Sequence, residues 1–201
     1  MDGGPAITTQ HLEPASLEPL VRFMHDQAFS DNPHWRSCHC VFHYLTDEDD
    51  GLWATRSGAE NEASLRELAG SGGGHWILAY NGGQIVGYVN ADLAPALRRY
   101  GEWGVEAEPD TGLVACFVVH PAWRRQGIAT RLLDAAVTAL AARGAKRVDA
   151  YVVADPAAHA TQDPTEGYEQ LAHHGPLAMY LRAGFTLVDR NGPHAHVRLA
   201  L

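Results

Sequence analysis

The most informative part of the sequence is Phe117-Val-Val-His-Pro-Ala-Trp-Arg-Arg-Gln-Gly-Ile-Ala129. It leaves an apolar run typical of a buried strand, turns at Pro121, and opens a helix at a corner rich in arginine and glycine. Helix N-termini normally carry Asp, Glu, Ser or Thr, because their unpaired N–H groups and macrodipole favour a negative partner. Arg124 and Arg125 stand there instead, and Gly127 lets a ligand approach the backbone. A phosphate group is the simplest external anion for such a corner, so the sequence predicts a nucleotide- or coenzyme-binding site.

The segments on either side of this corner predict a strand–helix–strand unit. The continuous apolar run 113–119 predicts a strand in the centre of a sheet, covered on both faces. A helix over about 127–143 follows, and Gly144 ends it. Its apolar stripe consists of Ile128, Leu132, Leu133, Ala136, Val137 and Leu140. Residues 148–153 predict the next strand, which makes the connection a right-handed parallel crossover.

The remaining segments complete a mixed α/β sheet in one domain. Upstream, the patterns predict a strand over 7–12, a helix capped by Ser16 and an acidic loop over 46–51. A second helix is predicted from the capping box Ser57–Glu60 to Gly70. A hairpin of 76–80 and 84–90 follows around Asn81-Gly82-Gly83. Downstream, they predict a loop over 93–109, a short helix over 176–183, and closing strands over 185–188 and 197–201. The glycine run 70–74 lacks a Gly-Lys-Ser/Thr ending and is interpreted as a flexible connector.

The composition sets the broad class of protein. The chain has 201 residues, of which 46% are hydrophobic and 19% charged, a balance typical of one folded domain with a sizeable core. Its formal net charge of −9 argues against a nucleic-acid surface and favours a cationic or amine-bearing partner. No apolar run approaches a membrane span, the start resembles no signal segment, and three cysteines fit a reducing compartment. We therefore expect a cytoplasmic protein that binds neither nucleic acid nor a membrane.

The chain resembles the GNAT superfamily of acetyl-CoA-dependent N-acetyltransferases. The family's acyl-CoA signature has Gln or Arg, two variable residues, Gly, one variable residue, then Gly or Ala, and Arg124-Arg-Gln-Gly127-Ile-Ala129 satisfies it. A second family pattern, Tyr180-Leu-Arg-Ala-Gly184-Phe185, follows at the expected distance. The resemblance covers about residue 76 to the C-terminus. It implies an α/β fold with a mixed, mostly antiparallel sheet, a central parallel strand pair and flanking helices.

The resemblance also implies a division of the chain and a set of site residues. A single domain over 1–201 would have an elaborated helical region over 1–74 and a core over 75–201 that holds the acetyl-CoA site. The pantetheine arm would pair with the strand end, where it separates from the strand 148–153, and the pyrophosphate would bind the signature loop. Tyr180 matches the family's thiol-protonating tyrosine, although an aromatic core residue would show the same pattern. The coenzyme-binding residues would be Phe117, Val118, Val119, Arg124, Arg125, Gln126, Gly127, Ile128, Ala129 and Thr130.

The proton acceptor for the amine is not assigned by these patterns. Many family members carry Glu or His on the central strand, but Cys116 is the one ionisable side chain of 113–119, and we expect it to pack as a small hydrophobe. His120 at the strand end, Asp92 at the end of the second hairpin strand, and an ordered water stay open as candidates. Asp155 stands where family members often have an asparagine near the coenzyme.

The segment His34-Trp-Arg-Ser-Cys38-His-Cys40-Val-Phe-His43 is unusual in its density of His and Cys. Zinc sites usually take their four ligands from two separated pairs, and no second pair follows at a telling spacing, so we expect no metal. The segment resembles the Asn-Pro-x-Trp…Cys-x-Cys segments of a subset of GNAT-like proteins. We interpret Trp35, Cys38 and Cys40, with Asp92, as acceptor-side residues. The loop 156–173, with Tyr168, is expected to form a further wall of the acceptor pocket, with a surface insertion as the alternative. His173-His174 is interpreted as a solvated pair.

The leading hypothesis is an enzyme that transfers an acetyl group from acetyl-CoA to a primary amine of a small molecule by direct attack. A protein or peptide amine is an alternative acceptor within the same class. A non-catalytic module that binds acyl-CoA as a regulator, and a metal-dependent sensor, are alternatives from other classes. The resemblance leaves open a homodimer, because dimers are common in the superfamily.

Overall fold

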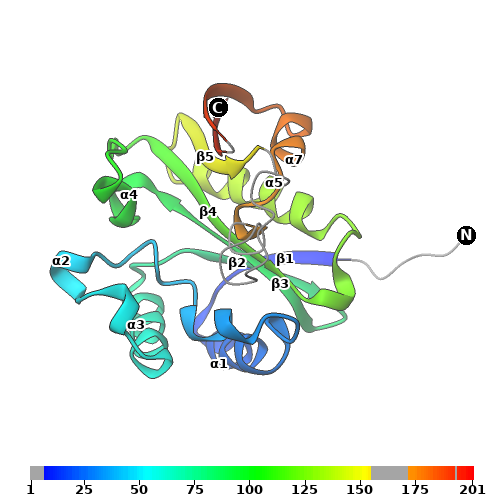
Figure 1. Ribbon diagram of the computed structural model, residues 1–201. Coiled ribbons are helices and arrows are strands. Elements are labelled where there is room, and N and C mark those ends of the chain that lie inside the picture. Colours follow the sequence, from blue (N-terminus) through cyan, green and yellow to red (C-terminus); the bar gives the residue numbers. More distant parts are fainter. Residues whose placement is uncertain (1–6, 155–171, 193) are drawn as a thin grey trace, which may run out of the picture.

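One seven-stranded sheet organises the molecule, with the strand order β1-β2-β3-β4-β5-β7-β6 (Figure 1). The computed structural model describes residues 7–154, 172–192 and 194–201. Neighbouring strands run antiparallel, except for the parallel pair β4–β5. The strands are β1 Ile7–His11, β2 Trp76–Asn81, β3 Gln84–Leu93, β4 Thr111–Val119, β5 Arg147–Val153, β6 Thr186–Asn191 and β7 His194–Ala200. The expected α/β class and the mixed, mostly antiparallel sheet are confirmed.

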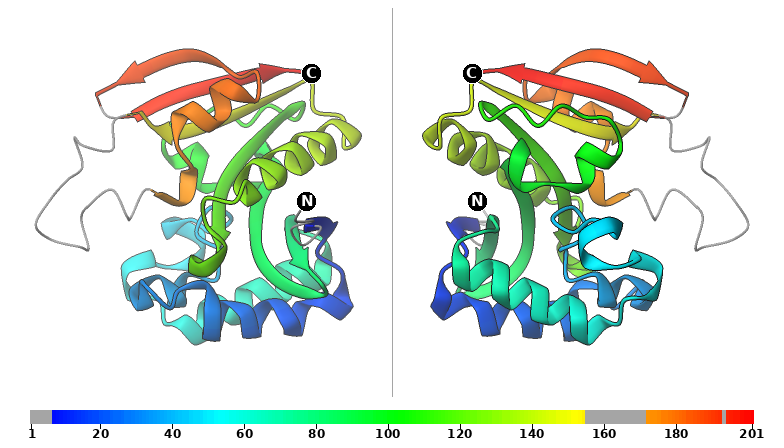
Figure 2. Two further views of the ribbon diagram at one scale, coloured as in Figure 1. Left: turned by 90° about the vertical axis from the view of Figure 1, so that its right-hand side faces the viewer. Right: turned by 90° about the vertical axis from the view of Figure 1, so that its left-hand side faces the viewer.

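Helices cover both faces of this sheet, with α1 and α3 on one face and α5 on the other (Figures 1 and 2). The α-helices are α1 Pro14–Phe23, α2 Asp47–Asp50, α3 Gly58–Ser71, α4 Arg99–Glu102, α5 Ile128–Ala142 and α7 Leu177–Arg182. A π-helical turn, η1 (Met24–Ala28), continues α1. The 3-10 turns are η2 Pro33–Cys38, η3 Trp53–Thr55, η4 Ala94–Ala96, η5 Pro121–Trp123 and η7 Ala172–His174.

Each face of the sheet carries its own apolar core. On the first face, buried residues of α1, η1 and α3 pack with residues of β2, β3 and β4. On the second face, the apolar stripe of α5 packs on the same strands and on β5, together with α7. The fully or nearly fully buried side chains of that stripe are Ile128, Leu132, Leu133, Ala136, Ala139 and Leu140. A sheet covered on both faces explains why β4 reads as a continuous apolar run.

Two expected helices need correction at one end, and two expected loops contain a short helix. The first helix begins at Pro14 and has no side-chain cap; Ser16 lies inside it, and its hydroxyl accepts a hydrogen bond from Tyr80 at 3.2 Å. Pro14 has no N–H group to satisfy, and the N–H of Ser16 donates to the backbone oxygen of Glu13 at 2.8 Å in place of a capping side chain. The capping box Ser57–Glu60 is confirmed, but its helix continues to Ser71 and Gly72 ends it. The expected acidic loop contains α2, and the loop 93–109 contains α4.

A buried ion pair joins β5 to β7 at one end of the sheet. Asp149 is 3% exposed and accepts hydrogen bonds from Arg198 Nε and Nη2, each at 2.7 Å, while His196 Nε2 lies 3.2 Å from Oδ2. Burial raises the pKa of Asp149, but the hydrogen bonds from Arg198 and His196 outweigh it and hold the pKa at about 2. A carboxyl pKa that is lower in the folded than in the unfolded chain stabilises the fold above its unfolded value.

We predict that Asp149→Asn lowers the free energy of unfolding by about 2 kcal/mol at pH 7, since the pKa difference of about two units corresponds to roughly that value. The difference between native protein and variant should shrink as the pH falls from about 4 to about 2, where the native carboxyl also gains its proton. Urea unfolding at several pH values measures it. Asp110→Asn is the control, because Asp110 pairs with the 80% exposed Lys146 side chain and should change stability much less. A pH-independent difference would contradict the role of the Asp149 charge.

Candidate active site

The corner between β4 and α5 has the geometry of an anion site. Arg125 and Gly127 adopt left-handed backbone angles, with φ of 62° and 80°, and Gly127 is the residue from which α5 starts. The first helical bond runs from Arg131 N to Gly127 O at 3.1 Å, so the N–H groups of 128–130 have no acceptor within the helix. The first turn of α5 contains no acidic residue, and no side chain caps it. Space is open beside Gly127, where an added Cβ would meet no atom within 4 Å.

Arg124 does not leave its charge free at this corner. Its Nε donates to Val119 O at 3.0 Å, and its guanidinium pairs with Asp31, with Nη2 3.1 Å from Oδ1. Gln126 is also tied back, because its Nε2 donates to Ala122 O at 3.1 Å. Arg125 is exposed, so its side chain is the one of the two arginines placed to meet an incoming anion.

A β-bulge in β4 separates this strand from β5. Opposite β3, Asn90 pairs with Cys116 and Ala91 with Val114, which leaves Ala115 as the extra residue. The pairing of β4 with β5 ends at Val114, so residues 115–119 have no partner on β5. The expected separation of the two strands is therefore present, and it begins at the bulge.

The bulge also changes which face of the sheet the following side chains of β4 occupy. Beyond it, Cys116 and Val118 belong to the core beneath α1 and α3, whereas Phe117 packs in the core beneath α5. The chain after residue 171 lies beside this part of β4. Pro176 forms a parallel β-bridge with Val153, and a side chain at Gly175 would meet the Phe117 ring at 3.8 Å.

Tyr180 lies next to the point where the two strands separate. Its side chain is fully buried, its ring packs edge-on against Phe117 and Phe185, and its hydroxyl donates to His174 O at 2.9 Å. Burial raises the pKa of Tyr180 well above its ordinary value, so the phenol keeps its proton at neutral pH. A buried phenol that holds a proton can be a core residue, and it also meets the requirement for a general acid.

On the α1/α3 side of β4 lies a cavity of about 440 Å³. Its walls come from the unusual N-terminal segment, from β4 and from residues 173–174. The lining residues are Phe29, His34, Trp35, Ser37, Cys38, Cys40, Phe42, His43, Trp53, Trp103, Cys116, Val118, His173 and His174. Three of the four expected acceptor-side residues, Trp35, Cys38 and Cys40, are therefore brought together here.

Asp92 and His120 lie elsewhere. Asp92 is 1% exposed, and its carboxylate accepts hydrogen bonds from Arg143 at 2.6 Å and from Tyr44 at 3.2 Å, which makes it part of a buried ion pair. His120 caps η5, because its Nδ1 accepts a hydrogen bond from Ala122 N at 3.1 Å. Asp155 and Tyr168 lie outside the described residues.

Two histidines of the cavity were not identified as functional candidates from the sequence. His43 is 2% exposed and stacks on Tyr100, with ring centroids 5.2 Å apart. Burial, followed by the neighbouring His173 and Arg99, lowers the pKa of His43 to about 3. Burial is also the main cause that lowers the pKa of His174 well below its ordinary value. Both imidazoles are neutral at pH 7, and His173 and His174, interpreted as a solvated pair, are half-buried in the cavity wall. No local pattern links His43 to His174; the fold alone brings their rings to 5.9 Å.

The cavity thiols pack with a buried tyrosine. Cys40 Sγ lies 2.8 Å from Tyr88 Oη and 3.3 Å from Cys116 Sγ. The contact with Cys116 is the main cause that raises the pKa of Cys40 well above its ordinary value, so Cys40 stays a thiol at neutral pH. Nucleophilic cysteines need a lowered pKa, so this thiol is not an activated nucleophile. The expectation that Cys116 packs as a small hydrophobe is confirmed by its place in the first core.

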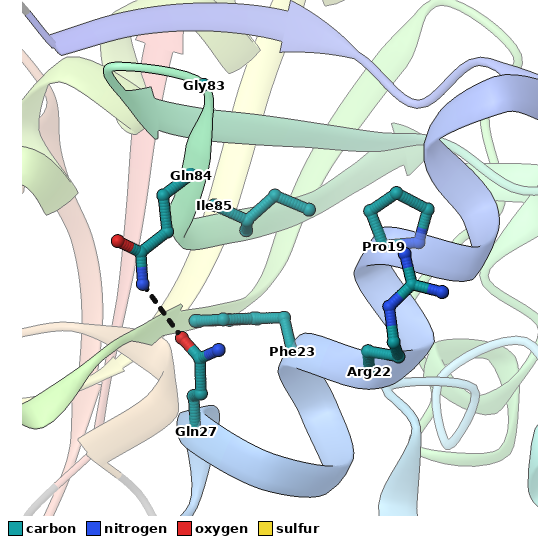
Figure 3. Close-up of a pocket in the computed structure, with 7 residues that line it drawn as sticks. All are labelled: Pro19, Arg22, Phe23, Gln27, Gly83, Gln84 and Ile85. Atoms are coloured by element: carbon teal, nitrogen blue, oxygen red, sulfur yellow. Dashed lines mark hydrogen bonds between the residues drawn. The ribbon is translucent and has the colours of Figure 1, made fainter.

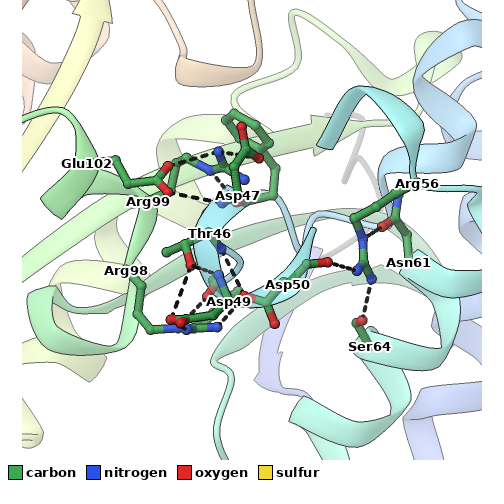
Figure 4. A network of polar contacts seen from close by, with 12 residues as sticks. Thr46, Asp47, Asp49, Asp50, Arg56, Asn61, Ser64, Arg98, Arg99 and Glu102 are labelled. Atoms are coloured by element: carbon green, nitrogen blue, oxygen red, sulfur yellow. Dashed lines mark hydrogen bonds and ion pairs between the residues drawn. The ribbon is translucent and has the colours of Figure 1, made fainter. Parts of the chain in front are cut away.

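A polar clamp holds the outer wall of the cavity (Figure 4). Arg98 donates to Asp49 at 2.8 Å and to Asp50 at 2.6 Å, and so ties α2 to the start of α4. Arg99 is 5% exposed, donates to Asp47 at 2.9 Å, and its guanidinium lies 4.7 Å from the centre of the Phe42 ring. The acids of α2 are thus used to fix the aromatic wall.

A smaller hollow of about 180 Å³ lies between α1, η1 and the turn from β2 to β3 (Figure 3). Gln84 Nε2 donates to Gln27 Oε1 across it at 3.2 Å. Its described lining includes neither Tyr180 nor any residue of β4, so it is separate from the candidate active site.

The comparisons with known proteins agree with this arrangement. The sequence matches the family described as Acetyltransferase (GNAT) family over residues 26–162, which is more than half of the chain. The protein therefore belongs to the GNAT acetyltransferase family. Among curated proteins no significant match is found. None of the described helices is both long and apolar enough to cross a lipid bilayer.

Solved structures of GNAT enzymes share the fold along nearly the whole chain. PaiA N-acetyltransferase from Thermoplasma acidophilum, solved with coenzyme A, is 14% identical, with a TM-score of 0.53 over 98% of this chain and 99% of that one. Ribosomal-protein-alanine N-acetyltransferase from Brucella melitensis is 17% identical, with a TM-score of 0.54 over 96% and 99%. A GNAT-family acetyltransferase from Streptococcus pneumoniae is 18% identical, with a TM-score of 0.53 over 98% and 99%. At such identities the likeness shows the fold alone.

Proposed function

We propose that this protein transfers an acetyl group from acetyl-CoA to a primary amine of a small molecule by direct attack. One observation carries the proposal. The part of β4 that has left β5 runs from the neighbourhood of Tyr180 and the aromatic cavity to the anion corner of α5. A coenzyme extended along this strand would have its phosphates at the corner and its thioester beside the cavity.

The coenzyme would be held mainly by backbone groups. Residues 125–130 would present their N–H groups to the pyrophosphate, and residues 117–119 would pair with the amide-rich pantetheine arm in the manner of an added strand. The PaiA N-acetyltransferase structure, which has the same fold, contains coenzyme A and supports this part of the proposal. The exposed Arg125 side chain would add a positive charge, whereas Arg124 would brace the loop through Asp31.

The chemistry needs a proton at the sulfur and a proton acceptor at the amine. The amine nitrogen attacks the thioester carbonyl carbon, the C–S bond breaks, and the thiolate takes a proton from the Tyr180 hydroxyl. Tyr180 now donates that proton to His174 O, and the raised pKa keeps it available at neutral pH. The proton lost by the amine nitrogen would pass to the His174 imidazole, directly or through one water, and from there to the Tyr180 phenolate, which returns both groups to their neutral forms. This histidine takes the place of the Glu or His that other family members carry on the strand.

The cavity favours an amine with an aromatic or other apolar body. Its walls are dominated by the rings of Phe29, Trp35, Phe42, Trp53 and Trp103. None of the lining residues in the described part of the chain is a carboxylate, so the contacts that these residues offer an amine are mainly aromatic. Ring faces pack well against an apolar body, which fits a compact aryl- or alkylamine better than a long peptide.

A screen of amines tests the function. Mass spectrometry should detect an N-acetylated product and an equal amount of free CoA with aryl-alkylamines, and much less product with polyamines, lysine peptides and free peptide N-termini. Tyr180→Phe should lower kcat about 100-fold or more and leave the Kd for acetyl-CoA within a few-fold, because it removes one hydroxyl that acts in the transition state. Binding of acetyl-CoA without turnover on any amine would favour the non-catalytic module instead. Product on lysine or N-terminal peptides alone would favour the protein acetyltransferase.

The anion corner is tested by an isosteric pair at Gly127. Both Gly127→Asn and Gly127→Asp place a side chain at a φ of 80°, a conformation that these two residues tolerate better than most. Only the aspartate adds a negative charge beside the pyrophosphate. Calorimetry should therefore show that Asp weakens acetyl-CoA binding at least about tenfold more than Asn, and that added salt reduces this difference. Equal affinities of the two folded variants would argue against pyrophosphate binding there.

The role of His174 is tested by its effect on the pH profile. His174→Gln should lower kcat/KM about 100-fold or more, while His120→Gln, the control, should change it little. Because its pKa is lowered, His174 keeps its base form below pH 6.5, so its protonation limb in the native profile should lie under that value. The limb of the pH profile that comes from His174 should be absent in His174→Gln, whereas limbs that come from ionisation of the amine substrate should remain. An unchanged profile would remove His174 from the mechanism.

A further inference from the structure

Outside the candidate active site, three side chains from separate segments meet at the surface of the helical layer. His25 lies on η1, His39 in the turn after η2, and Glu62 on α3. His25 Nε2 is 3.1 Å from His39 Nε2 and 3.0 Å from Glu62 Oε2, and His39 Nε2 is 3.9 Å from the same oxygen. Within the described residues, this is the one group of His, Cys, Asp and Glu whose ligand atoms could jointly hold a metal ion.

The three donor separations match those around a small divalent cation. Zinc binds histidine nitrogen and carboxylate oxygen at about 2.0–2.2 Å in tetrahedral geometry, which places neighbouring donors about 3.3 Å apart. The observed separations of 3.0, 3.1 and 3.9 Å lie around that value. Two imidazoles and one carboxylate with an open fourth position form a common zinc donor set.

Outer contacts orient two of the three donors. His39 is 3% exposed, and its Nδ1 lies 3.2 Å from Ser37 O. Nδ1 must carry the hydrogen to bond this carbonyl, so the Nε2 lone pair points to the cluster. Glu62 Oε1 is held by Arg66 Nε at 2.9 Å, which leaves Oε2 directed at the histidines. Outer partners of this kind are typical of metal-binding histidines and carboxylates.

The backbone at this place is also strained. His39 and Cys40 have φ angles of 49° and 51°, two successive left-handed residues that are not glycine. Such conformations cost free energy and persist where the surroundings, or a ligand, fix them. The strained turn joins His39 to Cys40, whose thiol lines the aromatic cavity.

We propose that His25, His39 and Glu62 form a zinc site, with water as the fourth ligand. The water position faces solvent, because the side chains of His25 and Glu62 are 44% and 22% exposed. The sequence argued against a metal because the dense His and Cys segment has no second pair downstream. The fold supplies the missing ligands from residues 25 and 62, on either side of that segment. The ion would join η1 and α3 to the turn that carries Ser37, Cys38 and Cys40, three residues of the cavity wall.

Metal titration of the full chain, after removal of metal with a chelator, tests the proposal. Zn²⁺ should bind with one equivalent per chain and a Kd below about 1 µM. Zinc should also raise Tm, because it binds the folded chain and not the unfolded one. Cobalt as a probe should give the visible absorption of a tetrahedral ion, without the near-ultraviolet bands of a thiolate ligand.

Variants distinguish this site from other binding. His25→Ala and Glu62→Gln should each weaken zinc binding by more than the roughly 10–100-fold that loss of an outer partner costs. His25 is partly exposed, so its removal leaves the core intact. His34→Ala is the matched control, an exposed histidine of the neighbouring segment that should leave binding unchanged. Thiolate bands with cobalt, zinc binding that His25→Ala does not weaken, or no stoichiometric binding by the native chain would each overturn the proposal. None of these measurements needs turnover, so their outcome is independent of the acetyltransferase activity.

Discussion

The departure of β4 from β5 after Val114 is the constraint on which the rest of the site depends. Ala115 has no partner on β3, and this extra residue bends the strand and changes which face the following side chains occupy. Phe117 therefore packs with Tyr180 beneath α5, while Cys116 lines the cavity on the other face. A single inserted residue thus places one strand end between an anion corner and a pocket, which a regular parallel pair would not do.

The helix α5 and the outer wall of the cavity are held in place by different kinds of interaction. Beneath α5, the stability comes from a regular apolar stripe on a long helix, the simplest way to cover a sheet. The cavity wall has little regular structure, and polar groups fix it: Arg98 and Arg99 hold the acids of α2, and Arg99 also lies over Phe42. Arg99 is nearly buried, so its pairing with Asp47 and Glu102 offsets the cost of removing it from water. The face beneath α5 is therefore built from a regular sequence pattern, whereas the cavity wall depends on individual polar contacts.

The same contrast explains how much could be predicted from the sequence. Local periodicity and turn residues predict the helix of residues 128–142, the strand β4 that precedes it, and the β2–β3 hairpin. The signature corner is predicted by one glycine and its neighbours. The acceptor side was only partly predictable, because its contacts join residues far apart in the chain. His43 contacts His174, and His25 contacts Glu62, but no spacing in the sequence indicates either contact. The strong preference of serine for the N-cap position predicts a cap at Ser16, but Pro14 sets the start of the helix.

The acidic composition favours an amine partner, yet the described acidic residues do not lie in the lining of the cavity. The carboxylates of α2 pair with arginines, Asp92 pairs with Arg143, and the described cavity lining contains no carboxylate. Among these described lining residues, an ammonium ion would lose hydration without gaining a counter-charge, which is unfavourable. The neutral amine is also the form whose nitrogen lone pair can attack a thioester. Under the proposed mechanism, the environment that makes the charged amine unstable would therefore favour the reactive form, and aromatic contacts in place of charge would choose the substrate.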